Sequence, residues 1–267
     1  MKILALFAKN DSYFMIKDFI RKQLNKKGYD IIKLNKLKQW PVDFDDSHKQ
    51  IIEKVQPYTM TEQERIFGLI EAVRYLTKNK IKGDIIECGV WRGGSMLAIA
   101  DVLMEMNDTD HNLYLFDTFE GMPPPSENDI SYTNRTADEL LLPDVDKTED
   151  LIWAYSSLNA VKKTMSLTNF PQTKIHYIKG KVEETLPLDS IGNICLLRLD
   201  TDWYESTKHE LIHLYPKLIK GGVLIIDDYG FWKGARKAVD EYFTENNIPI
   251  LLNRLDATGR IAIKAYD

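Results

Sequence analysis

Acidic residues end two apolar runs of the sequence, in a pattern that could hold a metal ion. A predicted strand over residues 194–200 ends in Asp200, and another over 223–228 ends in Asp227 and Asp228. If these are neighbouring parallel strands, their carboxyl ends share one sheet edge and the acids converge. Carboxylates this close repel one another and raise each other's pKa values. A hard divalent cation relieves the repulsion, and oxygen-only ligands favour Mg²⁺, with Mn²⁺ or Ca²⁺ as replacements.

Such a cation would have a chemical role beside a substrate hydroxyl. Coordination lowers the pKa of an alcohol and fixes its oxygen while a neighbouring carboxylate takes the proton. We expect Asp200 to be that base and Asp200, Asp227 and Asp228 to be the metal ligands. The alternative is that these acids cap the segments that follow them or pair with Arg198 or Lys233.

A glycine-rich turn follows the first strand predicted in the main sheet and opens a helix. It reads ECGVWRGGS from Glu87 to Ser95. Glycine lets the backbone pass close to a ligand, and the helix N-terminus offers free N–H groups to a carboxylate or phosphate. The turn lacks the Lys-Ser or Lys-Thr pair of a P-loop, and Glu87 precedes Gly89, where it could meet the positive end of S-adenosylmethionine. A glycine turn without a ligand is the alternative.

Two further strand ends would face the same ligand. Asp117 ends a predicted strand over residues 112–117, and a carboxylate there can accept both ribose hydroxyl protons of a nucleoside. Gly180 and Val182 follow a predicted strand over 174–179 and would lie near the base of such a cofactor. An ordinary strand-to-helix turn is the alternative for that segment.

The elements that would position these residues alternate between short β-branched runs and longer helical segments. This alternation predicts a doubly wound α/β fold, with a mostly parallel sheet covered by helices on both faces. A capping box at Thr61-Glu62-Gln63-Glu64 predicts a further helix from Thr61 to about Thr77. The predicted strands are 84–89, 112–117, 174–179, 194–200 and 223–228 with a closing pair at 250–255 and 261–265, and the other helices are 94–106, 151–168, 206–220 and 233–246.

Two segments lie outside this pattern. Residues 1–45 read as a strand, an amphipathic helix and a second strand, so we expect an N-terminal α/β appendage to a domain over 46–267. Residues 121–150 form the longest irregular stretch and begin with a proline run. Because this loop leaves the carboxyl end of a strand, we expect a substrate lid rather than a disordered insert.

Composition excludes several classes of protein. The net charge of −5 over 267 residues argues against a large nucleic-acid footprint, which needs a surplus of Lys and Arg. Cys88 and Cys195 each lie inside an apolar run, so we expect buried free thiols and a cytoplasmic location. No apolar stretch approaches the ~20 residues of a membrane span.

The sequence resembles the macrocin O-methyltransferase family, whose members methylate sugars of macrolides and aminocoumarins. The resemblance runs from about Tyr58 to the C-terminus, and residues 1 to about 45 depart from it. It is carried by the strings YTMTEQER, GDIIECGVWRGGS, LYLFDTFEGMPPP, IHYIKGKVEETLP, LRLDTDWYESTKHELIHLYPKL and GGVLIIDDYGFWKGARKAVDEYF.

This resemblance implies a class I methyltransferase fold with a seven-stranded Rossmann-like sheet and S-adenosylmethionine as methyl donor. It also implies Mg²⁺ held against vicinal hydroxyls of a small-molecule acceptor, and a homo-oligomer of two or more chains. From composition we expect neither nucleic acid nor a membrane as a partner. The resemblance further implies that Tyr58 and Met60 close over the cofactor and that residues 121–150 close over the acceptor. By motif, Glu87, Gly89, Ser95 and Asp117 would contact the cofactor and Asp200, Asp227 and Asp228 would hold the metal, with Asp200 as base.

Several alternatives stay open from sequence. A catechol-type O-methyltransferase would use the same metal chemistry on an aromatic diol, and Trp203, Tyr204, Tyr229 and Trp232 could stack on a ring, pack on a sugar or belong to the core. A nucleotide-dependent dehydrogenase or nucleotide-sugar binding protein is disfavoured because the turn is not G-x-G-x-x-G. A scaffold without activity is disfavoured by the complete set of acids. Whether Asp202 joins the metal site also stays open.

Overall fold

The computed structural model describes residues 40–141 and 153–266. Contacts divide the chain into two units, Met1–Asp43 and Phe44–Asp267, and the described helices and strands belong to the second. The strand, helix and strand predicted before residue 35 lie outside the described residues, so the appendage stays a prediction. Within the described part, none of the helices is long and apolar enough to cross a membrane.

The unit is built on a seven-stranded sheet with the order β3-β2-β1-β4-β5-β7-β6. The first five strands of the chain run parallel, and β7 pairs antiparallel with both β5 and β6. This confirms the predicted mostly parallel, doubly wound sheet. The strands are β1 (Asp84–Cys88), β2 (Leu113–Asp117), β3 (Ile175–Lys179), β4 (Ile194–Leu199), β5 (Leu218–Ile226), β6 (Asn253–Arg254) and β7 (Arg260–Ile263).

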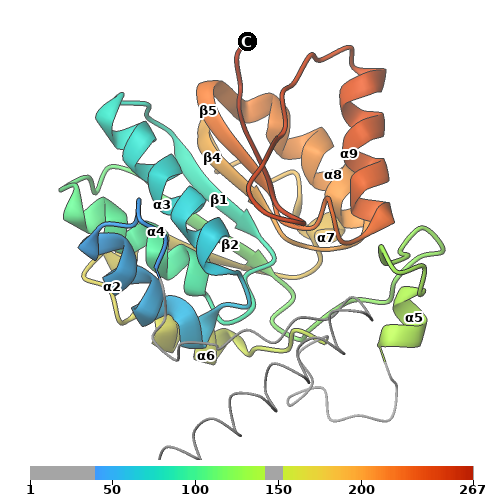
Figure 1. Ribbon diagram of the computed structural model, residues 1–267, viewed down its shortest axis with the longest axis horizontal. Coiled ribbons are helices and arrows are strands. Elements are labelled where there is room, and N and C mark those ends of the chain that lie inside the picture. The colour runs from blue at the N-terminus through green and yellow to red at the C-terminus, as the bar shows by residue number, and fades with distance from the viewer. Residues whose placement is uncertain (1–39, 142–152, 267) are drawn as a thin grey trace, which may run out of the picture. The chain divides into compact units, whose positions relative to one another are not determined.

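Helices cover both faces of the sheet (Figure 1). One layer contains α2, α3, α4 and α6, and the other contains α7, α8 and α9, with α8 packed between α7 and α9. The short helix α5 lies apart from both layers, beyond the carboxyl ends of the strands. The helices are α2 (Asp46–Val55), α3 (Gln63–Lys78), α4 (Gly94–Glu105), α5 (Ala137–Leu140), α6 (Leu158–Met165), α7 (Val182–Thr185), α8 (Tyr204–Leu214) and α9 (Lys233–Glu245), with 3₁₀ turns η1 (Gln56–Tyr58), η2 (Gln172–Lys174) and η3 (Tyr215–Lys217).

Apolar and polar side chains of β1 lie on opposite faces of the sheet. Ile86 and Cys88 of β1 belong to the same apolar cluster as Leu211 and Leu214 of α8. Successive strand residues point to opposite faces, so the residue between them, Glu87, faces the α3 and α4 layer. Both cysteines are free and buried, as predicted.

The capping box predicted at Thr61 is wrong. Helix α3 begins at Gln63, its N-cap residue is Glu62, and this cap lacks a side-chain hydrogen bond within the described chain. The Thr61 hydroxyl instead accepts a hydrogen bond from Nη2 of Arg198 at 3.2 Å. A tertiary contact with the buried site has therefore replaced the local cap.

Several element boundaries also differ from prediction. Helix α6 begins only at Leu158, where the Ser157 hydroxyl accepts from the Ala160 N–H and starts the helix. The helix predicted over 206–220 ends at Leu214, because a 3₁₀ turn that contains Pro216 follows and β5 starts at Leu218. The strand predicted over 250–255 pairs only at Asn253–Arg254.

Helices α2, α5 and the short α7 were not among the predicted helices. Helix α2 begins after Asp45, whose carboxylate accepts from the His48 N–H at 2.8 Å in a reciprocal cap. Helix α5 lies inside the stretch 121–150, where Thr136 and Glu139 form another capping box. Residues 142–152 of that stretch lie outside the description.

Candidate active site

A cavity of about 430 Å³ opens at the carboxyl ends of the parallel strands. Its volume falls within the ~300–1,000 Å³ range of small-molecule sites. Glu87 is the predicted site residue that does not line it, being 1% exposed. The other predicted site residues all line this cavity, namely Tyr58, Met60, Gly89, Ser95, Asp117, Gly180, Val182, Asp200, Asp227 and Asp228.

The glycine turn brings three chain segments into close contact. Gly89 has a φ of +83°, and a Cβ there would lie 1.9 Å from the Asp200 carbonyl oxygen. A Cβ at Gly94 would lie 2.6 Å from the Tyr58 carbonyl oxygen. The turn therefore lets both the Asp200 loop and the Tyr58 segment approach the start of α4. That helix has Gly93 as N-cap and no side-chain cap within the described residues, which leaves its first N–H groups to a ligand.

Asp117 also organises the glycine turn. One carboxylate oxygen accepts from the Val90 and Trp91 N–H groups at 2.7 and 3.0 Å. The other accepts from the Phe119 N–H at 2.6 Å. Burial raises the pKa of Asp117 while these backbone donors lower it. Asp117 therefore joins the ends of β1 and β2, a role that sequence reasoning missed, and its predicted contact with ribose stays a prediction.

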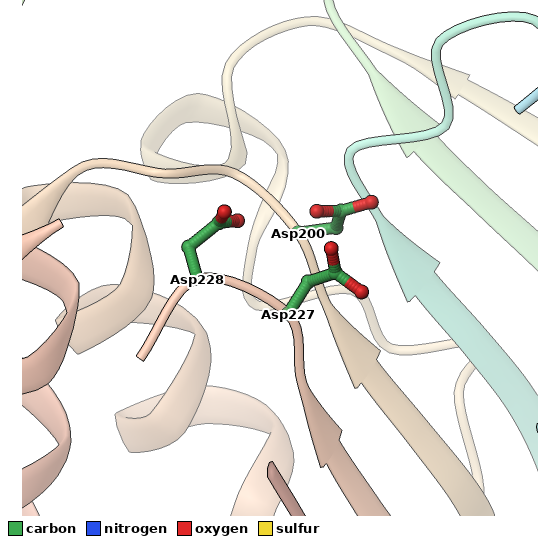
Figure 2. Close-up of side chains that lie close together, drawn as sticks. All are labelled: Asp200, Asp227 and Asp228. Atoms are coloured by element: carbon green, nitrogen blue, oxygen red, sulfur yellow. The ribbon is translucent and has the colours of Figure 1, made fainter. Parts of the chain in front are cut away.

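The three predicted metal ligands come together at the ends of β4 and β5. Asp200 follows β4, while Asp227 and Asp228 follow β5, and Figure 2 shows their carboxylates facing a shared space. One oxygen from each lies within 4.8 Å of the others. The parallel register sets this arrangement, because the Asp200 N–H bonds to the Cys88 carbonyl at 2.8 Å and the Asp227 N–H to that of Leu199 at 2.9 Å.

Arg198 lies among these acids. The alternative prediction, that the acids pair with Arg198, therefore holds for Asp200 and Asp227. Its guanidinium contacts Glu87 at 2.5 Å, Asp200 at 2.7 Å and Asp227 at 2.6 Å. Glu87 and Arg198 are register partners on β1 and β4, which explains their pairing. Lys233, the other suggested partner, instead donates to Asn134.

Sequence reasoning missed a second arginine. Arg65 of α3 contacts the Asp227 carboxylate and also lies 2.8 Å from Asp256. Both oxygens of Asp227 thus face a guanidinium, one from Arg198 and one from Arg65. No local pattern marks Arg65, because its contact depends on how α3 packs against the end of β5.

Burial dominates the electrostatics of the acids. It raises the pKa of Asp200 to about 6, with Arg198 opposing and Asp228 adding to the shift. It raises the pKa of Asp202 to about 7, with Asp200 adding to the shift. It also raises the pKa of Asp228 well above its usual value, with Asp202 and Asp227 adding to the shift. Asp202 thus interacts with the cluster and lines the cavity, although the close group of oxygens contains only the other three acids among the described residues.

Two buried oxygens indicate which groups this site would accept. Oδ2 of Asp228 and Oε2 of Glu87 have no hydrogen-bond partner among the described residues. An unpaired buried acceptor is costly, and a cation is the partner that compensates a carboxylate best. The Asp228 oxygen and the oxygen-only set therefore fit a hard divalent metal. Burial raises the pKa of Glu87 to about 8 against the effect of Arg198, and a further positive group nearby would favour its charged form.

The aromatic residues divide between cavity and core. Trp232 lines the cavity, as does Phe231, which sequence reasoning did not single out. Trp203 packs edge-on against Trp232 with ring centroids 4.8 Å apart, and its Nε1 donates to the Pro123 carbonyl at 3.0 Å. Tyr204 does not line the cavity and instead donates to Glu241.

The described part of the predicted lid also lines the cavity. Its lining residues are Gly121, Met122, Pro123 and Leu140. The pairing of Ser131 with Trp232 holds this segment against the start of α9.

Known proteins with this sequence pattern are O-methyltransferases. The demethyldecarbamoylnovobiocin O-methyltransferase of Streptomyces niveus is 29% identical over 76% of this chain and 74% of its own length. An 8-demethyl-8-(2,3-dimethoxy-alpha-L-rhamnosyl)-tetracenomycin-C 4'-O-methyltransferase of Streptomyces olivaceus is 30% identical over 76% of this chain and 74% of its own length.

Solved structures agree with this assignment. The O-methyltransferase NovP superposes with a TM-score of 0.68 at 28% identity, over 78% of this chain and 83% of its own. The predicted class I methyltransferase fold is therefore confirmed. The family model for macrocin-O-methyltransferase (TylF) matches residues 11–263, which is most of the chain. The chain belongs to the macrocin O-methyltransferase family of S-adenosylmethionine-dependent enzymes.

Proposed function

We propose that this enzyme methylates a sugar hydroxyl of a glycosylated natural product or polysaccharide precursor, with Mg²⁺ as an essential metal. The proposed metal is supported by the carboxylate oxygens of Asp200, Asp227 and Asp228, which lie within 4.8 Å of one another beside the glycine turn. The sugar is supported by the relatives, since the name of the tetracenomycin enzyme specifies a rhamnosyl-bearing substrate.

The cofactor would bind along the side of the cavity formed by the glycine turn. Gly89 and the N-terminal turn of α4, with Ser95, would receive the methionine part, and Asp117 the ribose. Gly180 and Val182, at the start of α7, would border the base. Tyr58 and Met60 would cover the cofactor, which suits Met60 being 46% exposed. The buried Glu87 carboxylate lies behind the residues that line the cavity, and would attract the positively charged end of the cofactor.

The acceptor would bind between the acids and the described part of the lid. Bound Mg²⁺ would lower the pKa of a coordinated hydroxyl. Asp200 would take the proton of that hydroxyl, because its carboxyl group lies in the same cluster as the metal ligands and lines the cavity. Phe231 and Trp232 would exclude water and pack on the acceptor, so that its oxygen is held in line with the methyl group.

A turnover assay tests this function. S-adenosylhomocysteine release would be measured with a panel of neutral glycosides that carry vicinal hydroxyls, and with catechol. We expect release with a glycoside in Mg²⁺, none in chelator and recovery when Mg²⁺ is restored. Full activity in chelator would reject the metal, whereas methylation of catechol alone would favour the catechol-type alternative.

A further inference from the structure

Helix α8 carries a buried carboxyl group that the chemistry above does not use. Glu210 is 0% exposed, and its Oε2 has no hydrogen-bond partner among the described residues. Its Oε1 accepts from the Thr201 hydroxyl at 2.9 Å. A carboxyl group buried in this way is costly, and its hydrogen bond with Thr201 connects it directly to the loop of the acids.

Glu210 lies beneath the point where two site segments meet. Cys88, the last residue of β1, is close enough for Glu210 to raise the pKa of its thiol. The Cys88 carbonyl accepts the Asp200 N–H, and the next residue, Gly89, nearly touches the Asp200 carbonyl. The Glu210 carboxyl is thus adjacent both to the glycine turn and to the loop that starts with Asp200.

That loop needs support from outside its own backbone. Asp202 has a φ of +67°, a left-handed conformation that costs a residue with a Cβ on the order of 1 kcal/mol. Such a conformation persists only where neighbouring contacts determine it. The Trp203 N–H bonds to the Thr201 carbonyl at 2.7 Å, and the Thr201 side chain is held by Glu210. Thr201 is therefore fixed by its side chain as well as its backbone.

We propose that Glu210 is a positioning residue, which holds Thr201 from beneath and thereby fixes Asp200 and Asp202 at the cavity. The proposal rests on the proposed function, because it concerns the geometry of that metal and base site. Glu210 itself does not line the cavity and touches no reacting group.

The carboxyl group serves as a neutral hydrogen-bond acceptor. Burial raises its pKa well above the ordinary value, Thr201 opposes this, and the charges of Glu183 and Asp200 add to the rise. A protonated carboxyl accepts through its carbonyl oxygen and adds no negative charge beneath the acids. Glutamine has the same shape and the same acceptor, so it should replace Glu210.

The experiment compares Glu210→Leu and Glu210→Gln with wild type. Hydrogen exchange would follow the peptide that contains residues 200–203, and titrations would give the affinities for Mn²⁺ and for S-adenosylhomocysteine. Thr201→Val removes the same hydrogen bond with little change in side-chain volume. It would be measured in place of Glu210→Leu if that variant did not fold. Asp84→Leu is the control, because Asp84 is a buried acceptor for Asn112 and Gly192 at the opposite end of β1.

We expect Glu210→Leu and Thr201→Val each to speed exchange in 200–203 and weaken Mn²⁺ binding by about tenfold, as loss of one buried hydrogen bond allows. S-adenosylhomocysteine affinity should change by less than about twofold, and Glu210→Gln should match wild type in every measurement. The double variant Glu210→Leu with Thr201→Val should show the same exchange and Mn²⁺ affinity as either single variant, since both substitutions remove the same hydrogen bond.

Two results would overturn the proposal. One is unchanged exchange in 200–203 in both Glu210→Leu and Thr201→Val, and the other is a Glu210→Gln variant that behaves like Glu210→Leu. Asp84→Leu should leave exchange in 200–203 unchanged. Failure of the wild type to bind Mn²⁺ would reject the metal in the proposed function, while the exchange data would still decide the role of Glu210.

Discussion

At the scale of single residues, the acids were predictable and their arginine partners were only partly so. Asp200, Asp227 and Asp228 follow apolar runs, which marks strand ends in any parallel sheet. Arg198 is a charged residue within such a run, and its pairing with the acids was the alternative considered from the sequence. Arg65 carried no comparable signal, because nothing local indicates that its helix begins beside Asp227.

Arg198 should be a major source of stability. Removing it leaves Glu87, Asp200 and Asp227 buried without their shared counter-charge, which costs about 3–5 kcal/mol for a buried pair. We expect Arg198→Leu to lower the free energy of unfolding by about that much in urea denaturation. Mg²⁺ should restore stability more in this variant than in wild type, because a cation can supply the missing charge.

An exposed arginine provides the control for that prediction. Arg236 pairs with Asp240 on the surface of α9, with its side chain 62% exposed, so Arg236→Leu should change stability by less than about 0.5 kcal/mol. Equal stability of the two variants would contradict the role given to Arg198.

At the scale of elements, periodicity located the strands and long helices, and tertiary contacts moved their ends. Thr61 had the sequence of a cap but bonds to Arg198 instead. Helix α2 was missed because its start depends on a reciprocal cap between Asp45 and His48, a pairing that the usual Ser or Thr with Glu pattern does not include. Local chemistry thus predicts which elements exist better than where they begin.

The packing of η1 on α4 should matter for cofactor binding. In Gly94→Ala the new Cβ would meet the Tyr58 carbonyl at 2.6 Å and push the Tyr58 segment away from the cavity. We expect S-adenosylhomocysteine affinity to fall by about tenfold in calorimetric titration, equivalent to about 1.4 kcal/mol of overpacking. Gly192→Ala, whose nearest atom would be 3.9 Å away, should bind normally. Equal affinities in the two variants would contradict this packing argument.

The cap of α2 should contribute stability that depends on pH. Contacts with His48 and Arg74 lower the pKa of Asp45 to about 2, overcoming the opposing effect of burial. The stabilisation is therefore complete above the unfolded pKa near 4, declines below it and is lost as pH falls through about 2. Asp45→Ala should cost about 1 kcal/mol at pH 7 and at pH 5, and less at pH 3.5.

Urea denaturation of Asp45→Ala and wild type at those three pH values would measure the difference. Asp189→Ala, at an exposed acid of the β3 to β4 connection, is a control that should cost little at any of them. A difference between wild type and Asp45→Ala that grows toward low pH would contradict the assigned role of the carboxylate.

At the scale of the whole molecule, the sequence predicted the doubly wound sheet and the edge where the site lies. Both follow from alternating elements, because parallel strands connected by helices place their carboxyl ends together. The order of β6 and β7 and the layer to which each helix belongs needed the structure. The appendage over residues 1–45 and the homo-oligomer implied by the family stay predictions.

The central claim is that Asp200, Asp227 and Asp228 hold one divalent cation beside the methyl donor. Its most direct test is a Mn²⁺ titration, by electron paramagnetic resonance, of the protein loaded with S-adenosylhomocysteine. We expect one Mn²⁺ per chain, displaced by Mg²⁺, with binding weakened about tenfold or more in Asp228→Asn and unchanged in Asp189→Asn. No Mn²⁺ binding by the wild type, or equal binding by Asp228→Asn, would contradict the claim.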